Sequence, residues 1–403
     1  MMASSLPDHL VEEILVRLPQ DEPVHLARAS LVCTSWRRVL VSDRDCFLRR
    51  CRGFHGAPPL LGYFDLSYGN DAKRFVPATS TTSPVRMPAL HRRRWSAVDC
   101  RHGRVLIHYE DEDEDRSKRG FIVWDPLTGR QQHLGMPSAS YPSHMCLYTS
   151  YTGAVLCAKD DGGCDHLDCQ AAAGPFRVVC VETNLLRPIF ACATSYSSLT
   201  GEWNAPAPKP NHDNHDFLRG HAKHSLLVGD AIYFLFQDDR TILRYDLGRH
   251  WLSEMDLPPF MWNAALMTAE DGGLGLAALP NNDNRIHTWS WHDDDGSGGG
   301  CWVEQRVIEF ETLLPRRMRD KHYRVVGSAE GTSTVFVDIS FGTIFVLDVK
   351  SKKMSRFRKR NGGLFEYVLP YVRFYAPSEG STATTRDMKM HRSIHDPAPV
   401  EDA

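Results

Sequence analysis

The sequence predicts an α plus all-β protein, with a small N-terminal unit of three helices followed by a β-propeller-like domain of six to seven blades. Three observations lead to this fold class. Apolar residues follow helical spacing in the first 50 or so positions, short β-branched and aromatic runs begin at Leu60, and strand–turn–strand units recur after it. A β-sandwich is the alternative architecture for the same strands.

Length and composition narrow the class of protein. At 403 residues and roughly 150 residues per domain, two or three domains are expected, or one small and one large. The hydrophobic fraction of 42% suffices for a sizeable core. The 47 Lys+Arg against 50 Asp+Glu leave no basic domain of the kind that neutralises phosphates. We therefore expect a globular protein that binds no nucleic acid.

Targeting signals and cysteines bear on the compartment. No run approaches the 18 apolar residues of a membrane span, and Met1–Ser5 has neither the charge nor the apolar region of a secretion signal. The 11 cysteines, an odd number, are then expected in a reducing compartment without structural disulfides. We expect the protein in the cytoplasm, the nucleus or both, with no membrane partner.

The first segment predicts an amphipathic helix. Pro7 suits the first helical turn, and Pro19 stops the run. The apolar positions at helical spacing are Leu6, Leu10, Val11, Ile14, Leu15 and Leu18. Two more short helices are predicted over about Val24–Val32 and Ser35–Leu40. We take residues 1–50 as this helical unit and 51–59 as a linker, and expect the unit to be marginally stable without a partner because it buries little area.

Residues 60–377 are predicted to form the β domain. Its clearest strands are Val105–Tyr109, Phe121–Trp124, Phe176–Val181, Ala231–Phe236, Ile242–Tyr245, Arg285–Trp291, Val335–Ile339 and Thr343–Leu347. Three hairpins repeat an apolar strand, an Asp that opens a turn, and a returning strand; they are Phe121–Arg130, Ile242–Trp251 and Ile344–Met354. Weaker versions lie at Ser195–Trp203 and Trp289–Trp302. Such recurrence favours the outer hairpins of propeller blades over a sandwich.

A propeller must join its two ends, since otherwise an unpaired strand edge remains. We predict that Tyr371–Tyr375 pairs with Leu60–Phe64 to close the ring. Residues 378–403 are polar and charged with few apolar positions, so we expect a disordered tail.

The N-terminal segment also carries a specific signature. It reads Leu6-Pro7-x-x-Leu10-x-x-x-Ile14-Leu15-x-x-Leu18-Pro19, followed by Leu31-Val32-Cys33-x-x-Trp36-Arg37. This pattern, which covers about an eighth of the chain, resembles an F-box. The sequel through Phe54–Gly62 is similar to large plant F-box families that carry a C-terminal, F-box-associated β-propeller-like domain. Thr34-Ser35 departs from the family, in which a basic residue often follows the Cys.

The resemblance implies docking onto a Skp1-type adaptor and, through it, a cullin. It implicates Leu6, Pro7, Leu10, Ile14, Leu15, Leu18, Val32 and Trp36 in adaptor binding. Of these, we expect Val32 and Trp36 to lie mostly in the core of the helical unit. The chain would then be the non-catalytic substrate-receptor subunit of an SCF-type (Skp1–cullin–F-box) ubiquitin ligase. Its β domain would bind a protein target, which the sequence does not identify.

Two sets of candidate metal ligands have weaker support. His212-x-x-His215 and His221-x-x-His224 have zinc-like spacing but lie in a Pro/Asn/Asp-rich loop, and Cys164-x-His166-x-x-Cys169 lacks a fourth ligand. Solvated loops explain both sets, so we assign no metal, cofactor or catalytic residue. The acidic run Glu110–Asp115 favours a solvated hairpin tip, with a docking site for a basic partner as the alternative.

The chain also has basic segments, and it lacks the common catalytic motifs. The alternation of residues in Met354–Arg360 predicts a strand with a basic solvent face. The alternative is that this segment, Lys352-Lys353 and His91–Arg94 are nuclear-import patches. No Walker A, G-x-S-x-G or G-x-G-x-x-G motif has the strand-to-helix context it needs. An enzymatic or small-molecule-binding propeller with a helical extension remains the alternative function, because propeller loops bring distant residues together.

Overall fold

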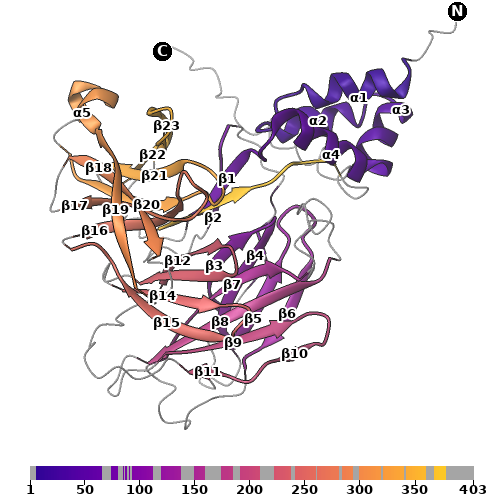
Figure 1. Cartoon of the computed structure of the whole chain (residues 1–403). Coiled ribbons are helices and arrows are strands. Elements are labelled where there is room, and N and C mark those ends of the chain that lie inside the picture. Colours follow the sequence, from indigo (N-terminus) through magenta and orange to yellow (C-terminus); the bar gives the residue numbers. More distant parts are fainter. Residues whose placement is uncertain are drawn as a thin grey trace, which may run out of the picture. The chain divides into compact units, whose positions relative to one another are not determined.

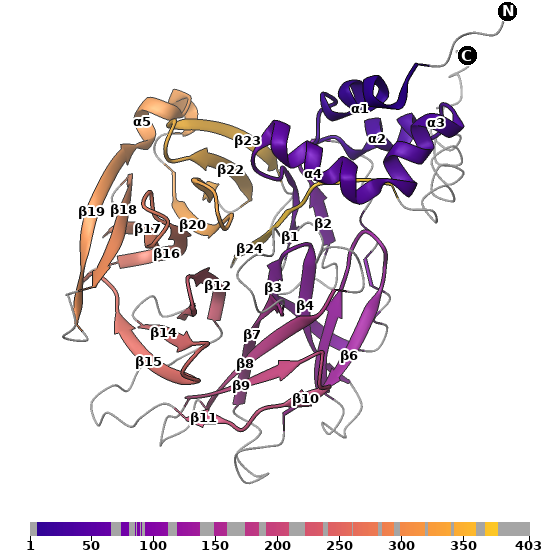
Figure 2. The same cartoon turned by 45° about the vertical axis from the view of Figure 1, so that its right-hand side comes forward.

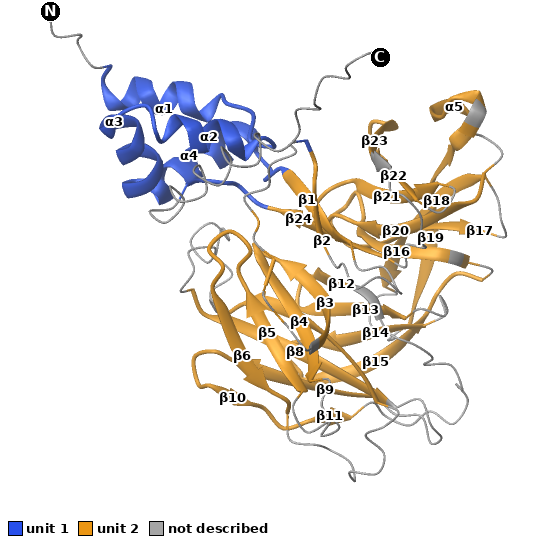
Figure 3. Ribbon diagram, turned by 180° about the vertical axis from the view of Figure 1, so that it is seen from behind, with its two compact units in different colours: residues 1–59, 79–84, 373–403 blue, residues 60–78, 85–372 orange. Residues whose placement is uncertain are grey.

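In the computed structural model, the chain forms two compact units (Figures 1 and 3). The first comprises Met1–Pro59, Thr79–Pro84 and Arg373–Ala403, and the second comprises Leu60–Ala78 and Val85–Val372. The structure describes residues 6–65, 74–79, 85, 87–88, 90, 93–111, 119–137, 149–158, 174–184, 191–208, 222–236, 241–259, 261–280, 284–293, 299–318, 321–339, 342–359 and 367–377. The expected tail, residues 378–403, lies outside these ranges.

Helices make up the first unit. They are α1 (Asp8–Val16), α2 (Pro23–Ala29), α3 (Thr34–Arg37), the π-helical turn η1 (Arg38–Ser42) and α4 (Arg44–His55). The three predicted helices are present, with ends that differ by a few residues. Helix α4 was not predicted, and it occupies half of the expected linker at 51–59. Residues 373–377, expected in the β domain, belong to this first unit.

The helical unit has its own apolar interior. Its buried side chains are Val11, Leu15, Val16, Leu26, Ala29, Val39, Leu40, Phe47, Leu48 and Cys51. Polar contacts then join α4 to α1: Arg50 pairs with Glu12 at 2.5 Å and with Glu13 at 2.9 Å, and the His55 ring donates to the Val16 carbonyl at 2.7 Å. Because the last carbonyls of a helix lack intrahelical partners, the contact from His55 completes the C-terminal end of α1.

The second unit is a six-bladed β-propeller, which confirms the predicted class and excludes the sandwich. Its inner strands contact one another in ring order, namely β3, β7, β12, β16, β20 and β24, and then β3 again. Figure 2 shows the sheets arranged around this ring, with strands such as β6, β15 and β19 on the outside. All eight strands predicted from the sequence lie within observed strands.

Five blades each run from an inner to an outer strand in chain order. Blade 1 has β3 (Arg93–Arg101), β4 (Arg104–Asp111), β5 (Arg119–Trp124) and β6 (Gln131–Gly135). Blade 2 has β7 (Thr149–Cys157), β8 (Phe176–Asn184), β9 (Ala191–Ser197), β10 (Glu202–Trp203) and β11 (Ala207–Pro208), of which β10 and β11 both pair with β9. Blade 3 has β12 (Ala222–Val228), β13 (Ala231–Phe236), β14 (Thr241–Asp246) and β15 (Trp251–Asp256).

Blade 4 has β16 (Met261–Thr268), β17 (Leu274–Pro280), β18 (Arg285–Asp293) and β19 (Gly300–Glu309). A short helix, α5 (Phe310–Leu313), and a 3₁₀ turn, η4 (Arg316–Met318), lead on to blade 5. Blade 5 has β20 (Tyr323–Ser328), β21 (Thr334–Ile339), β22 (Thr343–Asp348) and β23 (Lys353–Lys359). The hairpins predicted over Ser195–Trp203 and Trp289–Trp302 are the pairs β9–β10 and β18–β19.

The repeated Asp is the residue that shapes the outer hairpin in alternate blades. In blade 3, Asp246 Oδ1 accepts from the backbone N–H groups of Gly248 and Arg249, at 3.1 and 2.9 Å. Asp125 in blade 1 and Asp348 in blade 5 accept turn N–H groups in the same way. A carboxylate that bonds backbone groups two or three residues ahead fixes the turn, which is why the pattern was visible in the sequence.

The sixth sheet closes the ring and joins the two ends of the propeller sequence. It has three strands, in the order β2 (Arg74–Pro77), β1 (Leu60–Asp65) and β24 (Val368–Val372). The predicted pairing is present but shifted: Leu60 pairs with Val372 and Phe64 with Leu369, so the closing strand ends before Phe374. Aromatic rings seal the sheet on both sides, with Phe64 5.6 Å from Trp124 of blade 1 and Tyr63 6.3 Å from Phe336 of blade 5.

Candidate docking surface and propeller centre

Helix α1 is apolar on two opposite sides. Val11, Leu15 and Val16 face the interior of the helical unit, whereas Leu10 and Ile14, four residues apart, are 41% and 43% exposed. Leu6 precedes the helix and is also exposed. Because a helix that packs on one side normally carries polar residues on the other, the exposed side indicates a surface that binds a partner.

The turn between α2 and α3 adds two more exposed apolar residues, Leu31 and Val32. The expectation that Val32 lies in the core is wrong, since its side chain is 63% exposed, and Trp36 is only half-buried. The backbone explains the exposure: the N–H of Val32 closes the last turn of α2 onto the Ala29 carbonyl, and the chain is extended at Cys33 before α3 starts.

Other residues predicted to bind an adaptor differ in their exposure. Leu15 is fully buried, so it holds the helices together rather than lying on the surface, and Leu18 is half-buried. Pro7 is exposed. Leu31 was not proposed as a site residue, although it stands beside Val32 in the quoted motif. We call the exposed residues the docking set; they are Leu6, Pro7, Leu10, Ile14, Leu31 and Val32.

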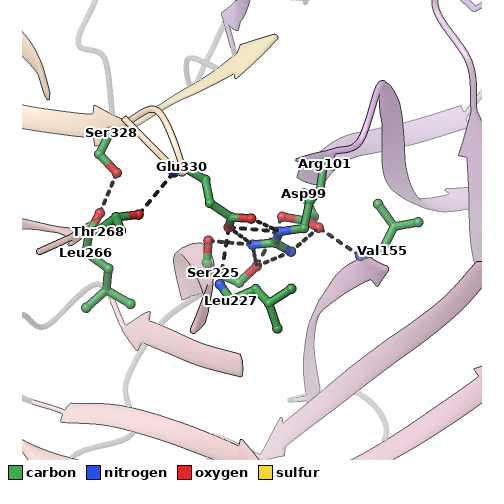
Figure 4. A network of polar contacts seen from close by, with 10 residues as sticks. Asp99, Arg101, Val155, Ser225, Leu227, Leu266, Thr268, Ser328 and Glu330 are labelled. Atoms are coloured by element: carbon green, nitrogen blue, oxygen red, sulfur yellow. Dashed lines mark hydrogen bonds and ion pairs between the residues drawn. The ribbon is translucent and has the colours of Figure 1, made fainter. Parts of the chain in front are cut away.

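The centre of the propeller holds a buried ionic cluster that the sequence analysis did not find (Figure 4). Arg101, at the end of β3, donates to Asp99 at 2.8 Å and to both carboxylate oxygens of Glu330, from the β20–β21 turn, at 2.7–2.9 Å. It also donates to the Ser225 carbonyl of β12 at 3.0 Å. One guanidinium group therefore ties together blades 1, 3 and 5.

Further bonds extend the cluster to blades 2 and 4. Asp99 accepts from the Val155 N–H of β7 at 2.8 Å and from the Ser225 hydroxyl at 3.1 Å. In addition, the Ser328 hydroxyl donates to the Leu266 carbonyl of β16 at 2.5 Å. Each inner strand other than β24 thus takes part in a polar contact drawn in Figure 4.

Electrostatics at the cluster reflect its burial. Burial raises the pKa of Asp99 to about 6, against the opposing effect of Arg101. The carboxylates of Asp99 and Glu330 in turn raise the pKa of Arg101, which keeps its charge. Because Asp99 and Arg101 are 2% and 5% exposed, the pair has little access to a substrate, and its geometry is that of a clamp between blades.

Of the candidate metal ligands proposed from the sequence, the structure describes only the backbone of His224. Cys164, His166, Cys169, His212, His215 and His221 lie outside the described residues, as does the side chain of His224 in β12. Within the described ranges, no group of three or more His, Cys, Asp or Glu is placed to hold a metal ion. The same part of the chain has no helix with the length and apolarity to cross a membrane.

The charged segments are likewise described in part. Of the acidic run, Glu110 and Asp111 end β4, and the rest lies outside the described residues. The basic segment forms strand β23, as predicted from its alternation, with Lys353 and Arg356 exposed. Lys352, also exposed, lies in the turn before this strand, and His91 and Arg92 lie outside the described residues.

Together, these observations define a protein of two parts, a helical unit that carries an exposed apolar set and a six-bladed β-propeller. Comparison with protein families specifies the class further. The F-box domain matches residues 3–48, and the family described as "F-box protein AT5G49610-like, beta-propeller" matches residues 96–378. The chain belongs to this family of plant-type F-box proteins. No curated protein matches it.

Solved structures resemble the chain at low sequence identity. A protein of unknown function from Bacteroides caccae is 9% identical, with 77% of this chain and 97% of that chain covered and a TM-score of 0.44. A chain of the nidogen/laminin complex is 12% identical, with 78% and 98% covered and a TM-score of 0.38. A luciferin-regenerating enzyme is 9% identical, with 65% and 76% covered and a TM-score of 0.35. These likenesses carry no argument about function.

Proposed function

We propose that this F-box protein is the substrate-receptor subunit of an SCF-type ubiquitin ligase. Its helical unit binds a Skp1-type adaptor, which connects it to a cullin, and its propeller binds a target protein. The observation that carries the proposal is the docking set, because its six apolar residues stay exposed although the same unit buries an apolar interior that includes Val11, Leu15 and Leu26. Phe54 of α4, 55% exposed, is a further exposed apolar side chain of this unit outside the set. The F-box match over residues 3–48 supports this reading of the surface.

The energetics favour docking through these side chains. Fully burying a Leu, Ile or Val side chain is worth about 1.5–3 kcal/mol, so even partial burial of the five such residues of the docking set supplies a useful binding energy. The helical unit is small, and buried contacts with a partner would add to its own limited core. Adaptor binding would therefore also stabilise the unit against unfolding.

In this role the chain contributes proximity rather than bond chemistry. The clamp at the propeller centre is buried, and its charged groups are paired with one another. Holding a target near a ubiquitin-charged enzyme turns a bimolecular encounter into an effectively intramolecular one. We propose the cytoplasm or nucleus as the location, because the exposed cysteines Cys33, Cys46 and Cys301 are free thiols, as in a reducing compartment.

Charge substitution in the docking set tests the proposal. Leu10→Asp and Ile14→Asp place a carboxylate where the adaptor would bury an apolar side chain, so each should weaken the pull-down of a recombinant Skp1-type adaptor at least tenfold. Val303→Asp is the matched control, because Val303 of β19 is 41% exposed, the same fraction as Leu10. The control should bind like the unmodified chain. Binding retained by the Leu10→Asp/Ile14→Asp double variant would refute the proposal.

A further inference from the structure

The outer strand of blade 5 differs in charge from those of the other blades. Seven of the eleven residues 350–360 are Lys or Arg, and none is Asp or Glu. Strand β23 forms from this segment and is the outermost strand of its sheet (Figure 2). The outer strands β6, β10, β11 and β15 contain no Lys or Arg, and β2 and β19 contain one each, Arg74 and Arg306. A strongly basic outer strand is therefore specific to blade 5.

We propose that the edge of β23 binds an extended acidic segment of the target protein as an added β-strand. The proposal rests on the receptor function proposed above, and it adds the chemistry by which the propeller recognises its target. Three observations carry it: the backbone groups along the edge, the cations beside them, and the packing that holds the strand in place.

The first observation is the edge itself. Within the described residues, β23 pairs only with β22. The pairing is regular over Lys353–Arg356, and Phe357 is the extra residue of a bulge that follows. In an antiparallel pair, alternate residues point their N–H and C=O groups away from the partner strand. Residues 353–356 therefore present backbone donors and acceptors with which an extended peptide can pair.

The second observation concerns the cations on this edge. Lys352, Lys353 and Arg356 are exposed, and we call these three residues the basic edge. In the part of the chain that the structure describes, none of their side chains forms an ion pair or a hydrogen bond. Carboxylates of a partner can therefore pair with them without breaking an ion pair of the propeller.

Carboxylates of the propeller also lie near the basic edge, and those of Asp348 and Glu270 already have partners. Asp348, opposite Lys353 on β22, accepts from the Ser351 N–H at 2.6 Å. Glu270 of blade 4 pairs with an arginine of β19 at 2.5 Å. Because Glu270 also interacts with Lys350, we leave that lysine out of the basic edge.

The cations define a spacing for the acidic residues of the partner. Successive side chains of a strand point to opposite faces, so Lys353 and Arg356, three positions apart, flank the edge on its two faces. In an added antiparallel strand, the residues opposite them are also three positions apart and lie on the same two faces. A segment with the pattern Glu-x-x-Glu therefore meets both cations, whereas Glu-x-Glu places both carboxylates on one face.

The third observation is that β23 is anchored on both of its faces. Met354 packs against the apolar core between blades 4 and 5, and Phe357 against the core between blades 5 and 6. The Phe357 ring lies 5.2 Å from the Tyr63 ring and 6.4 Å from the Phe336 ring. A strand that is already ordered pairs with a peptide at a lower entropic cost than one that must become ordered on binding.

Charges on an edge strand also have a protective role, because they prevent pairing with other sheets. Protection does not depend on the sign of the charge: β15 carries Glu254 and Asp256, and β19 carries both signs. A run of one sign repels basic segments and attracts acidic ones, so the basic edge adds selectivity to protection.

The test uses the full chain and fluorescein-labelled peptides of ten residues, in which Thr and Ser surround the test pattern. The four probes contain Glu-x-x-Glu, Glu-x-Glu, Gln-x-x-Gln, and Glu-x-x-Glu with alternate backbone nitrogens methylated. We expect fluorescence polarisation to show Glu-x-x-Glu binding about threefold tighter than Glu-x-Glu and about tenfold tighter than Gln-x-x-Gln. The methylated peptide should lose binding, because it lacks the backbone donors. Any of these three probes binding as tightly as Glu-x-x-Glu would overturn the proposal.

Variants assign the preference to the basic edge. Lys353→Glu/Arg356→Glu should bind Glu-x-x-Glu about tenfold more weakly and prefer Lys-x-x-Lys. Lys353→Gln/Arg356→Gln, which adds no acidic charge to the strand, should lose the preference without reversing it. Lys321→Glu/Arg249→Glu is the matched control for the first variant, because both residues are exposed, lie outside the outer strands and give the same change in net charge. A control that loses as much binding as Lys353→Glu/Arg356→Glu would overturn the assignment to this edge.

Two further outcomes would assign the basic edge to another partner. Light scattering after size-exclusion chromatography should show a monomer. A dimer that dissociates at high salt and in Lys353→Glu/Arg356→Glu would assign the edge to the acidic run Glu110–Asp115 of a second copy, and would overturn the proposal. Tighter binding of a labelled single-stranded oligonucleotide than of Glu-x-x-Glu would overturn it as well.

The adaptor pull-down separates this proposal from the receptor function. If the pull-down succeeds and the four peptides bind alike, the proposal for β23 fails and the receptor function stands. If Glu-x-x-Glu binds selectively while the adaptor does not bind, the basic edge is supported and the ligase role is refuted.

Discussion

Replacing Arg101 by methionine should strongly destabilise the propeller. The substitution keeps much of the side-chain volume but removes the donors to Asp99, Glu330 and Ser225. Glu330 has a side chain that is 30% exposed and so keeps contact with water, whereas Asp99 is left almost fully buried without its cation. Removing one partner of a buried ion pair costs about 3–5 kcal/mol, which is a large part of the 5–15 kcal/mol typical of a folded protein.

The same reasoning predicts how the loss depends on pH. Asp99 has its pKa raised from 3.8 to about 6 by burial, so the folded protein binds this proton more tightly than the unfolded chain does. Its contribution to stability is fully present below about pH 4 and is lost as pH rises through about 6, a difference of ~3 kcal/mol. Without Arg101 the pKa of Asp99 rises further. The variant should therefore approach the unmodified protein in stability as pH falls.

Urea unfolding at pH 8 and pH 5, followed by tryptophan fluorescence, measures both effects. Arg101→Met should unfold at a clearly lower urea concentration at pH 8, with a smaller difference at pH 5. The double variant Arg101→Met/Asp99→Asn should recover part of the loss, because it removes the unpaired charge. Arg356→Met, an exposed arginine of β23, should cost less than about 0.5 kcal/mol. A cost below about 1 kcal/mol for Arg101→Met at pH 8, or a difference that widens at pH 5, would refute this account.

Three further predictions concern closure, turns and the helical core. A chain cut before Leu369 should aggregate in light scattering, because the edge of β1 that pairs with β24 is left open. A chain cut after Pro377 keeps all of β24 and should stay monodisperse, and equal behaviour of the two would contradict the closure. Asp246→Ala should cost about 1–2 kcal/mol in urea unfolding near pH 7, and the difference should shrink below pH 4, because backbone N–H groups lower the pKa of Asp246 and its contribution is lost as pH falls through that pKa. Leu15→Ala should lower the free energy of unfolding of the helical unit by about 2–5 kcal/mol, and with it the melting temperature, without changing the surface of the unit. An unchanged melting temperature would place Leu15 outside the core.

Much of the fold was predictable because its signals are local. The turn carboxylates of Asp125, Asp246 and Asp348 bond groups within three residues along the chain, so each hairpin carries its own sequence pattern. Helix α4 was not predicted, because the contacts that place it are not local in the sequence. Its buried residues, Phe47, Leu48 and Cys51, stand among arginines, and its place in the unit depends on contacts with α1.

The sites were less predictable because their partners are distant in sequence. Arg101 bonds Ser225 and Glu330 from residues 124 and 229 positions away, and no short motif records such a meeting. Asp99 and Arg101 do lie on the same face of one strand, which is a weak signal of a charged interior. The exposure of Val32 depended on how α2 ends, and that is a property of backbone geometry rather than of side-chain hydrophobicity.

The closing sheet imposes an order on events during synthesis. The helices of the first unit leave the ribosome before the propeller strands, so they can fold while most of the propeller is still unmade. Strand β1 can pair with β24 only late in synthesis, because residues Val368–Val372 of β24 are among the last of the propeller to be translated. At typical rates of about 5–20 residues per second the wait lasts roughly 15–60 s. For that interval the ring of the nascent chain stays open, and the edge of β1 that later pairs with β24 has no strand beside it.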